Sequence, residues 1–164
     1  MMGCILRDFD YEPPPNVPPS VESRPNGSTP LNRIIKVDLS ATPGGDAGIP
    51  NEIHFEAEVR DQNVDQQLLA RIYFDNTLLR ELPIPAILDS ADPGRRPVEF
   101  DVPRSGIARG CHLVELLVTS EGGFEPFPSR EPREPGDIGS AQWWIAAGLT
   151  PDDPVEMNDC PEGQ

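Results

Sequence analysis

Residues 52–62 read EIHFEAEVRDQ, and apolar and polar side chains alternate along the whole stretch. Successive side chains of an extended strand point to opposite faces, so Ile53, Phe55 and Val59 lie on one face and the polar residues on the other. Strict alternation is typical of an antiparallel sheet that buries one face. The pattern therefore predicts a β domain.

Six further segments show the same period and are bounded by residues that end strands. The 21 prolines among 164 residues exceed the usual share of roughly 5%, which favours a compact β domain with extended flanks. The segment 77–85 carries two prolines and is expected at a sheet edge. About seven short strands predict an antiparallel two-sheet sandwich over residues 33–149. The six segments are 33–41, 68–76, 77–85, 96–103, 111–120 and 140–148.

The alternation also assigns the faces of individual strands. In residues 96–103, Val98, Phe100 and Val102 are expected inside the sandwich. In residues 68–76, the side chains expected inside are Ala70, Ile72 and Phe74, and those expected outside are Arg71, Tyr73 and Asp75.

Residues 110–118 read GCHLVELLV and resemble the sixth strand of immunoglobulin-like domains of the PKD and fibronectin type III kinds. In those domains the strand commonly reads Gly-x-aromatic or His-x-Val-x-Leu-x-Val. The resemblance implies an all-β, immunoglobulin-like sandwich. It also implies that His112 takes the place of the tyrosine corner, with its ring bonded to a nearby backbone group.

On this register Cys111 lies on the outer face of its strand, beside Leu113 and Leu117. Apolar residues on an outer face need a cover, and the tail of residues 150–164 is the candidate because it brings Cys160 over the sheet. A Cys111–Cys160 disulfide closes a loop of about fifty residues and needs an oxidising compartment. The alternative is three reduced thiols in a cytoplasm.

The remaining cysteine, Cys4, follows Met1-Met2-Gly3, and this stretch resembles the lipobox of bacterial lipoprotein signals. In that family the cysteine receives a lipid. The resemblance therefore implies a lipid on Cys4, a signal segment upstream and attachment to a membrane through the lipid. Ile5 stands where an aspartate would retain the protein in the inner membrane, so the resemblance implies the outer membrane, with a periplasmic or surface-facing domain.

Residues 8–32 contain seven prolines and almost no apolar pattern. Runs such as Pro13-Pro14-Pro15 favour the polyproline II form, which has no internal hydrogen bonds. A segment with so few apolar residues does not offset its ordering entropy, so we expect a disordered or extended N-terminal arm. The predicted organisation is an anchor and tether at 1–32, the sandwich at 33–149 and a packed tail at 150–164.

The net charge of −15 excludes nucleic acid and an anionic membrane surface as direct partners, because both repel an acidic protein. The sequence has no Gly-x-Ser-x-Gly motif, no phosphate-binding glycine loop and no Cys/His cluster with zinc spacing. Its acidic groups lack the residue order of a calcium loop. We therefore expect no enzymatic activity, no cofactor and no metal.

Residues 121–139 form a connection much longer than the usual hairpin loop of about two to five residues. Long loops on a rigid sandwich are common recognition surfaces. The candidate binding residues are Phe124, Phe127, Arg130 and Arg133. The alternative is that both phenylalanines fold back and cap the end of the sandwich. Trp144 is a second candidate, since one of the adjacent Trp143 and Trp144 faces outward, onto the tail or onto a partner.

These features predict a non-catalytic, envelope-anchored lipoprotein that acts as an accessory or structural subunit, or as a binding module, of an envelope assembly. Its partner is then another protein of that assembly. The alternative is a cytoplasmic or phage-type structural subunit whose N-terminal arm binds a neighbouring protein.

Overall fold

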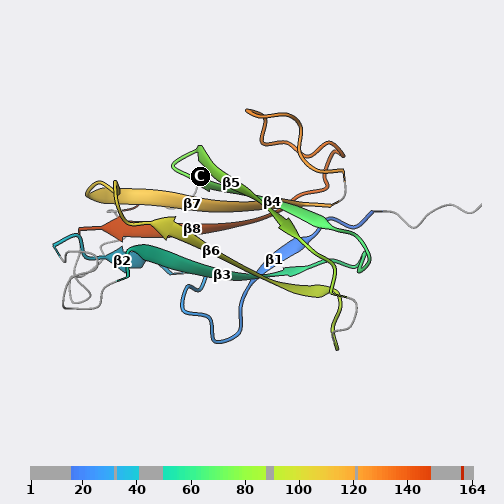
Figure 1. The fold of residues 1–164 in the computed structure, drawn as a ribbon, viewed down its shortest axis with the longest axis horizontal. Coiled ribbons are helices and arrows are strands. Elements are labelled where there is room, and N and C mark those ends of the chain that lie inside the picture. Colours follow the sequence, from blue (N-terminus) through green and yellow to red (C-terminus); the bar gives the residue numbers. More distant parts are fainter. Residues whose placement is uncertain are drawn as a thin grey trace, which may run out of the picture.

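The computed structural model describes residues 16–31, 33–40, 50–87, 91–120, 122–148 and 160. These residues form eight strands in two sheets, and none of them forms a helix that is long and apolar enough to cross a membrane. Figure 1 shows β7 and β8 in one layer and β3 in the other. The three-stranded sheet contains β1 (Ser20–Ser23), β3 (Glu52–Arg60) and β6 (Arg95–Pro103), in that order. The five-stranded sheet contains β2 (Ile35–Val37), β8 (Gly139–Ala147), β7 (Gly110–Thr119), β4 (Leu68–Phe74) and β5 (Thr77–Ile84), in that order.

The strand order is that of the immunoglobulin fold. β3 and β6 pair as strands B and E do, and β4, β7 and β8 follow the order C, F and G. β1 lies beside β3 in the place of strand A, and β5 lies beside β4 in the place of strand C′. All pairs are antiparallel apart from β2 and β8, which run parallel. The predicted all-β, immunoglobulin-like sandwich is therefore confirmed, and all seven predicted strands are present.

Three aromatic rings form the centre of the core between the sheets. Phe55 on β3 stacks on Phe100 of β6 with ring centroids 5.2 Å apart. Trp143 on β8 meets both rings edge-on, at 5.4 and 5.7 Å. Such aromatic pairs add to the free energy gained from burial. The indole Nε1 of Trp143 donates to the carbonyl oxygen of Thr29 at 2.9 Å, so the β1–β2 connection closes this side of the sandwich.

The arm expected over residues 8–32 is extended in the part that the structure describes, but the expectation that it does not pack on the sandwich is wrong. β1 lies within this range and pairs with β3 from Ser20 to Ser23. Val21 packs against the core. The physical reason is that β3 offers unpaired backbone groups along one edge, and a short extended segment satisfies them without a long apolar pattern. Residues 1–15, including Cys4, lie outside the described residues.

The inward alternation is confirmed for Ala70 and Ile72 on β4 and for Val98, Phe100 and Val102 on β6, all of which are buried. The predicted outward position of two other β4 side chains, Arg71 and Tyr73, is also confirmed, although neither faces solvent. Arg71 is 6% exposed and Tyr73 is 1% exposed. Both lie on the outer face as the alternation requires, but residues of the long β7–β8 connection cover them.

Arg96 is a buried charge at the end of the sandwich that the sequence pattern did not identify. Its side chain has no exposed surface. The guanidinium donates to the carbonyl oxygens of Gln66 at 2.5 Å, Asn63 at 3.1 Å and Val64 at 3.2 Å. The carboxylate of Asp61 lies 3.7 Å from the same guanidinium. Arg96 therefore fastens the β3–β4 connection to the core.

Both sheets have an edge strand on the side of the β5–β6 connection, and the predicted edge position of the strand at 77–85 is confirmed by β5. On β6 the even-numbered residues direct their backbone groups to β3, so the odd-numbered residues direct theirs to the open side. The bonds that fix this phase are Asp61 N to Gly94 O and Arg104 N to Asn51 O, both 2.9 Å.

Cys111 on β7 and Cys160 form the predicted disulfide, with their Cα atoms 5.3 Å apart. Cys160 is 3% exposed. Residues 149–159 and 161–164 lie outside the described residues, so the predicted packing of the tail is seen at Cys160 alone. This contact is on the outer face of the five-stranded sheet, where the register predicted it.

Candidate binding site

The long β7–β8 connection contains a small hairpin of its own. Figure 1 shows the connection in orange, standing out from the five-stranded sheet. Phe124 forms an isolated β-bridge with Pro132. The backbone N–H of Glu125 donates to Glu131 O at 2.9 Å, and that of Arg133 donates to Gly123 O at 3.0 Å. We call residues 123–133 the tip hairpin. Its paired backbone gives the connection a defined shape.

Arg71 of β4 attaches the tip hairpin to the five-stranded sheet. Its Nε donates to the carboxylate of Glu81 on β5 at 2.7 Å. Its Nη1 donates to two carbonyl oxygens of the hairpin, those of Glu125 at 3.0 Å and Ser129 at 2.8 Å. Hydrogen bonds from a charged group are stronger than neutral ones, and this guanidinium is shielded from water. The turn of the hairpin is therefore fixed to the sheet.

Phe124 does not face a partner. It is 3% exposed and belongs to a small cluster with Tyr73 and Leu117 on the outer face of the sheet. The guanidinium carbon of Arg71 lies 4.6 Å from the centroid of its ring, a cation–π distance. Phe124 thus joins the hairpin to the sheet, and the prediction that it forms part of a binding surface is not supported by its burial.

Arg130 makes a second attachment at the other side of the hairpin. Its guanidinium lies 4.4 Å from the ring centroid of Tyr73. It donates to the carboxylate of Glu115 on β7 at 2.6 Å and to Asn76 Oδ1 in the β4–β5 turn at 2.9 Å. Gln142 of β8 donates to the other oxygen of Glu115 at 3.1 Å. Arg130 therefore acts as an anchor, although its side chain is still about one-third exposed.

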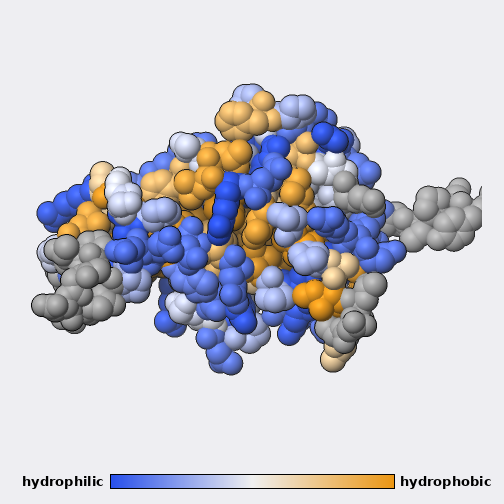
Figure 2. Space-filling view, viewed as in Figure 1, coloured by the Kyte–Doolittle hydropathy of each residue, from blue (hydrophilic) through white to orange (hydrophobic). Residues whose placement is uncertain are grey.

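Phe127 is the one predicted aromatic that remains free of the sheet. It lies between Pro126 and Pro128 at the turn of the hairpin, and 64% of its surface is exposed. Figure 2 shows hydrophobic colour at the outermost part of this connection, next to hydrophilic surface. Arg133 is also exposed, at the base of the hairpin. The alternative that both phenylalanines fold back is thus right for Phe124 alone, and Phe124 covers a sheet face instead of capping an end.

Trp144 lies where the alternation places it. Trp143 enters the core, and Trp144 faces outward opposite Leu113 of β7 and is half-buried. The expectation that the two neighbouring indoles face opposite sides is confirmed. The same outer face carries the Cys111–Cys160 disulfide.

The anchoring side chains Arg71, Glu115 and Asn76 were not among the residues singled out from the sequence. One signal for Arg71 and Glu115 was available, because each is a charged residue within an otherwise apolar strand. A charge on a central strand needs a partner, and the long connection is the segment able to provide one. Asn76 gave no comparable signal, since asparagine is common in turns.

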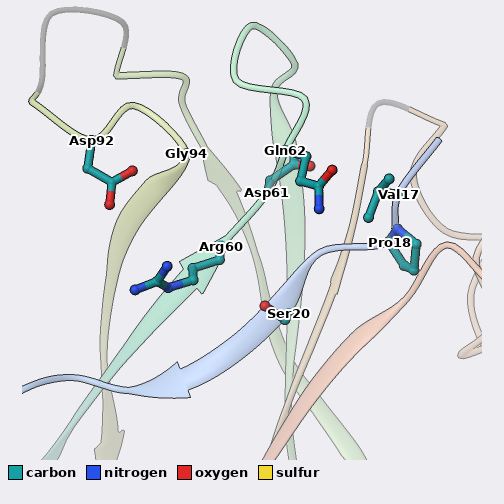
Figure 3. A pocket seen from close by; sticks show the side chains of 8 residues that line it. All are labelled: Val17, Pro18, Ser20, Arg60, Asp61, Gln62, Asp92 and Gly94. Atoms are coloured by element: carbon teal, nitrogen blue, oxygen red, sulfur yellow. The ribbon is translucent and has the colours of Figure 1, made fainter. Parts of the chain in front are cut away.

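A separate cavity of about 390 Å³ opens at the end of the three-stranded sheet. Figure 3 shows its wall, formed by the chain before β1, the end of β3 and the segment before β6. Burial raises the pKa of Asp61 in this wall, against the effects of the Asn63 N–H and the Arg96 charge. Arg60 pairs with Glu22 at 3.0 Å. The lining residues are Val17, Pro18, Ser20, Arg60, Asp61, Gln62, Asp92 and Gly94.

The lining of this cavity contains neither histidine nor cysteine, and its titratable side chains are Arg60, Asp61 and Asp92. Within the described part of the chain, no group of three or more His, Cys, Asp or Glu side chains is placed to hold a metal ion. The tip hairpin is therefore the strongest candidate for a functional site among the described residues.

Comparison with known proteins adds little to this description. No protein-family model matches the chain, and no curated protein matches it. One solved structure to which it is similar is a CARDB domain of a Pyrococcus furiosus protein in complex with di-metal ions. The identity is 13%, the TM-score is 0.40, and the match covers 77% of this chain and 91% of that one. So remote a likeness supports no statement about ligands, and the fold assignment stands on the strand order.

Proposed function

We propose that this chain is a non-catalytic binding module that docks a protein partner through the tip hairpin. The observation that supports this most is the 64% exposure of Phe127 on a hairpin whose turn is held by a buried arginine. A segment that is already ordered loses little conformational entropy when it binds. Aromatic side chains that enter a partner's pocket commonly provide much of the binding free energy.

We propose further that the module is attached to the cell envelope by a lipid on Cys4, as an accessory or structural subunit of an envelope assembly. The Cys111–Cys160 disulfide supports export, because such bonds persist in oxidising compartments. It leaves Cys4 as the odd cysteine of three, as a lipidated residue would be. The competing function is a cytoplasmic or phage-type subunit whose N-terminal arm contacts a neighbour.

The envelope proposal predicts the mass of the protein purified from its own source. We expect a chain that begins at Cys4, with a lipid-sized increment and a deficit of two hydrogens relative to the reduced form. Intact mass spectrometry before and after reduction measures both. A chain that begins at Met1 or Met2 with no increment and three free thiols would overturn the anchor and favour the competing subunit.

The binding proposal predicts a selective loss for Phe127→Ser. We expect affinity for the partner to fall by about tenfold or more, as for a hot-spot aromatic, while the free energy of unfolding changes by less than about 0.5 kcal/mol. Leu79→Ser is the matched control, since Leu79 is the next most exposed large apolar side chain among the described residues, at 42%.

The partner is first identified by a photo-crosslinking amino acid placed at position 127 or, for comparison, at position 79. The crosslinked protein is then purified, and its affinity for the wild type and both variants is measured by calorimetry. Equal affinity of the wild type and Phe127→Ser would contradict the proposal.

A further inference from the structure

Both ring nitrogens of His112 face hydrogen-bond acceptors. Nδ1 lies 2.6 Å from a carboxylate oxygen of Asp75, and Nε2 lies 2.9 Å from the carbonyl oxygen of Ala108. An ionised carboxylate and a carbonyl oxygen accept hydrogen bonds and do not donate them. A neutral imidazole has one N–H, so it satisfies one of these contacts, whereas an imidazolium satisfies both. The geometry therefore fits the charged ring.

The Asp75 carboxylate also organises the β4–β5 turn. Its Oδ1 accepts the backbone N–H of Leu113 at 2.9 Å, and the Asp75 N–H donates to Leu113 O at 2.9 Å. Asp75 and Asn76 have φ angles of 46° and 65°, the left-handed values that a two-residue turn of type I′ requires. The turn is thus fixed to β7 in two ways, through the backbone of Leu113 and through the ring of His112.

The same turn supports the tip hairpin. Asn76 Oδ1 accepts a hydrogen bond from Arg130 at 2.9 Å, and Arg130 is one of the side chains that attach the hairpin to the sheet. A continuous set of contacts therefore runs from His112 through Asp75 and Asn76 to Arg130. Contacts of this kind couple two sites when one element has two arrangements.

We propose that a proton on His112 fastens the β4–β5 turn and, through Asn76 and Arg130, the tip hairpin, so that the presentation of Phe127 depends on pH. The role of this pH dependence in partner binding rests on the proposed function of the hairpin. The link between the His112 proton and the hairpin itself can be tested without a partner.

The direction of the pH dependence follows from the surroundings of the ring. Burial lowers the pKa of His112, but the hydrogen bonds to Asp75 and to the Ala108 carbonyl and the charge of Asp75 raise it, and the net result is above the ordinary 6.5. The ring also stacks on the uncharged ring of Phe74, with the two ring centroids 5.1 Å apart. Cys111 beside it is in a disulfide and does not titrate.

When folding raises the pKa of a group, the proton on that group stabilises the folded state. The stabilisation is complete at any pH below the pKa of the group in the unfolded chain, and it is lost as the pH rises through the pKa in the folded chain. The hairpin is therefore held most firmly below about pH 6.5, the unfolded value, and loosens on the alkaline side.

The test is an NMR titration that follows the ring of His112, one of two histidines in the chain. We expect the His112 ring to titrate above 6.5. We also expect the exchange protection factors of the Glu125 and Arg133 amides, which close the hairpin, to fall as His112 loses its proton. These factors are corrected for the intrinsic effect of pH on exchange.

Two variants separate the steps of the coupling. Asp75→Asn removes the charge beside the ring, so we expect a lower pKa for His112 and a transition of the hairpin at the same lower pH. Asn76→Gly keeps the left-handed turn and removes the contact to Arg130, so His112 should titrate as in the wild type while the hairpin loses its pH dependence.

The proposal is overturned if His112 titrates at or below 6.5, or if the hairpin amides keep constant protection while the ring titrates. These readouts use the isolated chain. An unchanged partner affinity in Phe127→Ser would instead remove the proposed function and leave the proton-linked clamp intact, so the two failures are distinguishable.

Discussion

Arg96→Ala lowers the free energy of unfolding by about 3–5 kcal/mol, the range for removing one partner of a buried ion pair. The substitution leaves Asp61 as an uncompensated carboxylate whose side chain has no exposed surface. It also takes the donor from three carbonyl oxygens of the β3–β4 connection. Urea unfolding followed by tryptophan fluorescence measures the change, because Trp143 is fully buried in the native state.

Arg60→Ala is the matched control for Arg96→Ala. Arg60 ends the neighbouring strand, and its pair with Glu22 is nearly half exposed on both sides. Such surface pairs contribute about 0–1 kcal/mol. The double variant Arg96→Met/Asp61→Asn should recover part of the loss, since it removes the unpaired charge as well. Equal effects of Arg60→Ala and Arg96→Ala would show that the buried guanidinium does not stabilise the end of the sandwich.

Cys160→Ser is expected to cost about 4 kcal/mol on the chain-entropy account, because the disulfide joins residues separated by 49 positions. The bond restricts the unfolded chain, and it also holds Cys160 against the outer face of the sheet. Guanidinium unfolding with and without a reductant measures the effect.

The reductant provides the internal control for this second prediction. It should destabilise the wild type by the same amount as the substitution and leave Cys160→Ser unchanged. A wild-type protein that is indifferent to reductant while its thiols are shown to be free would mean that the disulfide contributes nothing to stability.

The sandwich was predictable because alternation is a local property. Ile53, Phe55 and Val59 lie two or more positions apart on one strand, so their common face can be read without knowing the partner strands. The sixth-strand resemblance also led to a correct local contact, since the His112 ring bonds the carbonyl of Ala108 as the tyrosine corner does. The same register placed Cys111 on the outer face, and this placement led to the correct prediction of its disulfide with Cys160.

The sequence indicated the position of the long connection that contains the tip hairpin, but not the role of each of its residues. Phe124 lies between Gly123 and Glu125, and Phe127 lies between two prolines, but neither setting shows which ring is buried. Phe124 is buried because it contacts Arg71 and Tyr73, which lie some fifty residues earlier in the sequence. β1 was missed for a related reason, since a four-residue edge strand is specified by the free edge of β3 more than by its own sequence.

The open edge of β6 has a consequence for how the protein behaves at high local concentration. Pro97 and Pro103 are odd-numbered, so the N–H groups that they lack are ones that would have faced outward. The N–H of Arg95 is already bonded to Asp92 O. The remaining outward donors of this strand are those of Glu99 and Asp101, each beside its own carboxylate. A strand from a neighbouring molecule therefore finds outward carbonyl oxygens but only two free N–H donors on this edge, so the edge resists the growth of a continuous sheet from one molecule to the next.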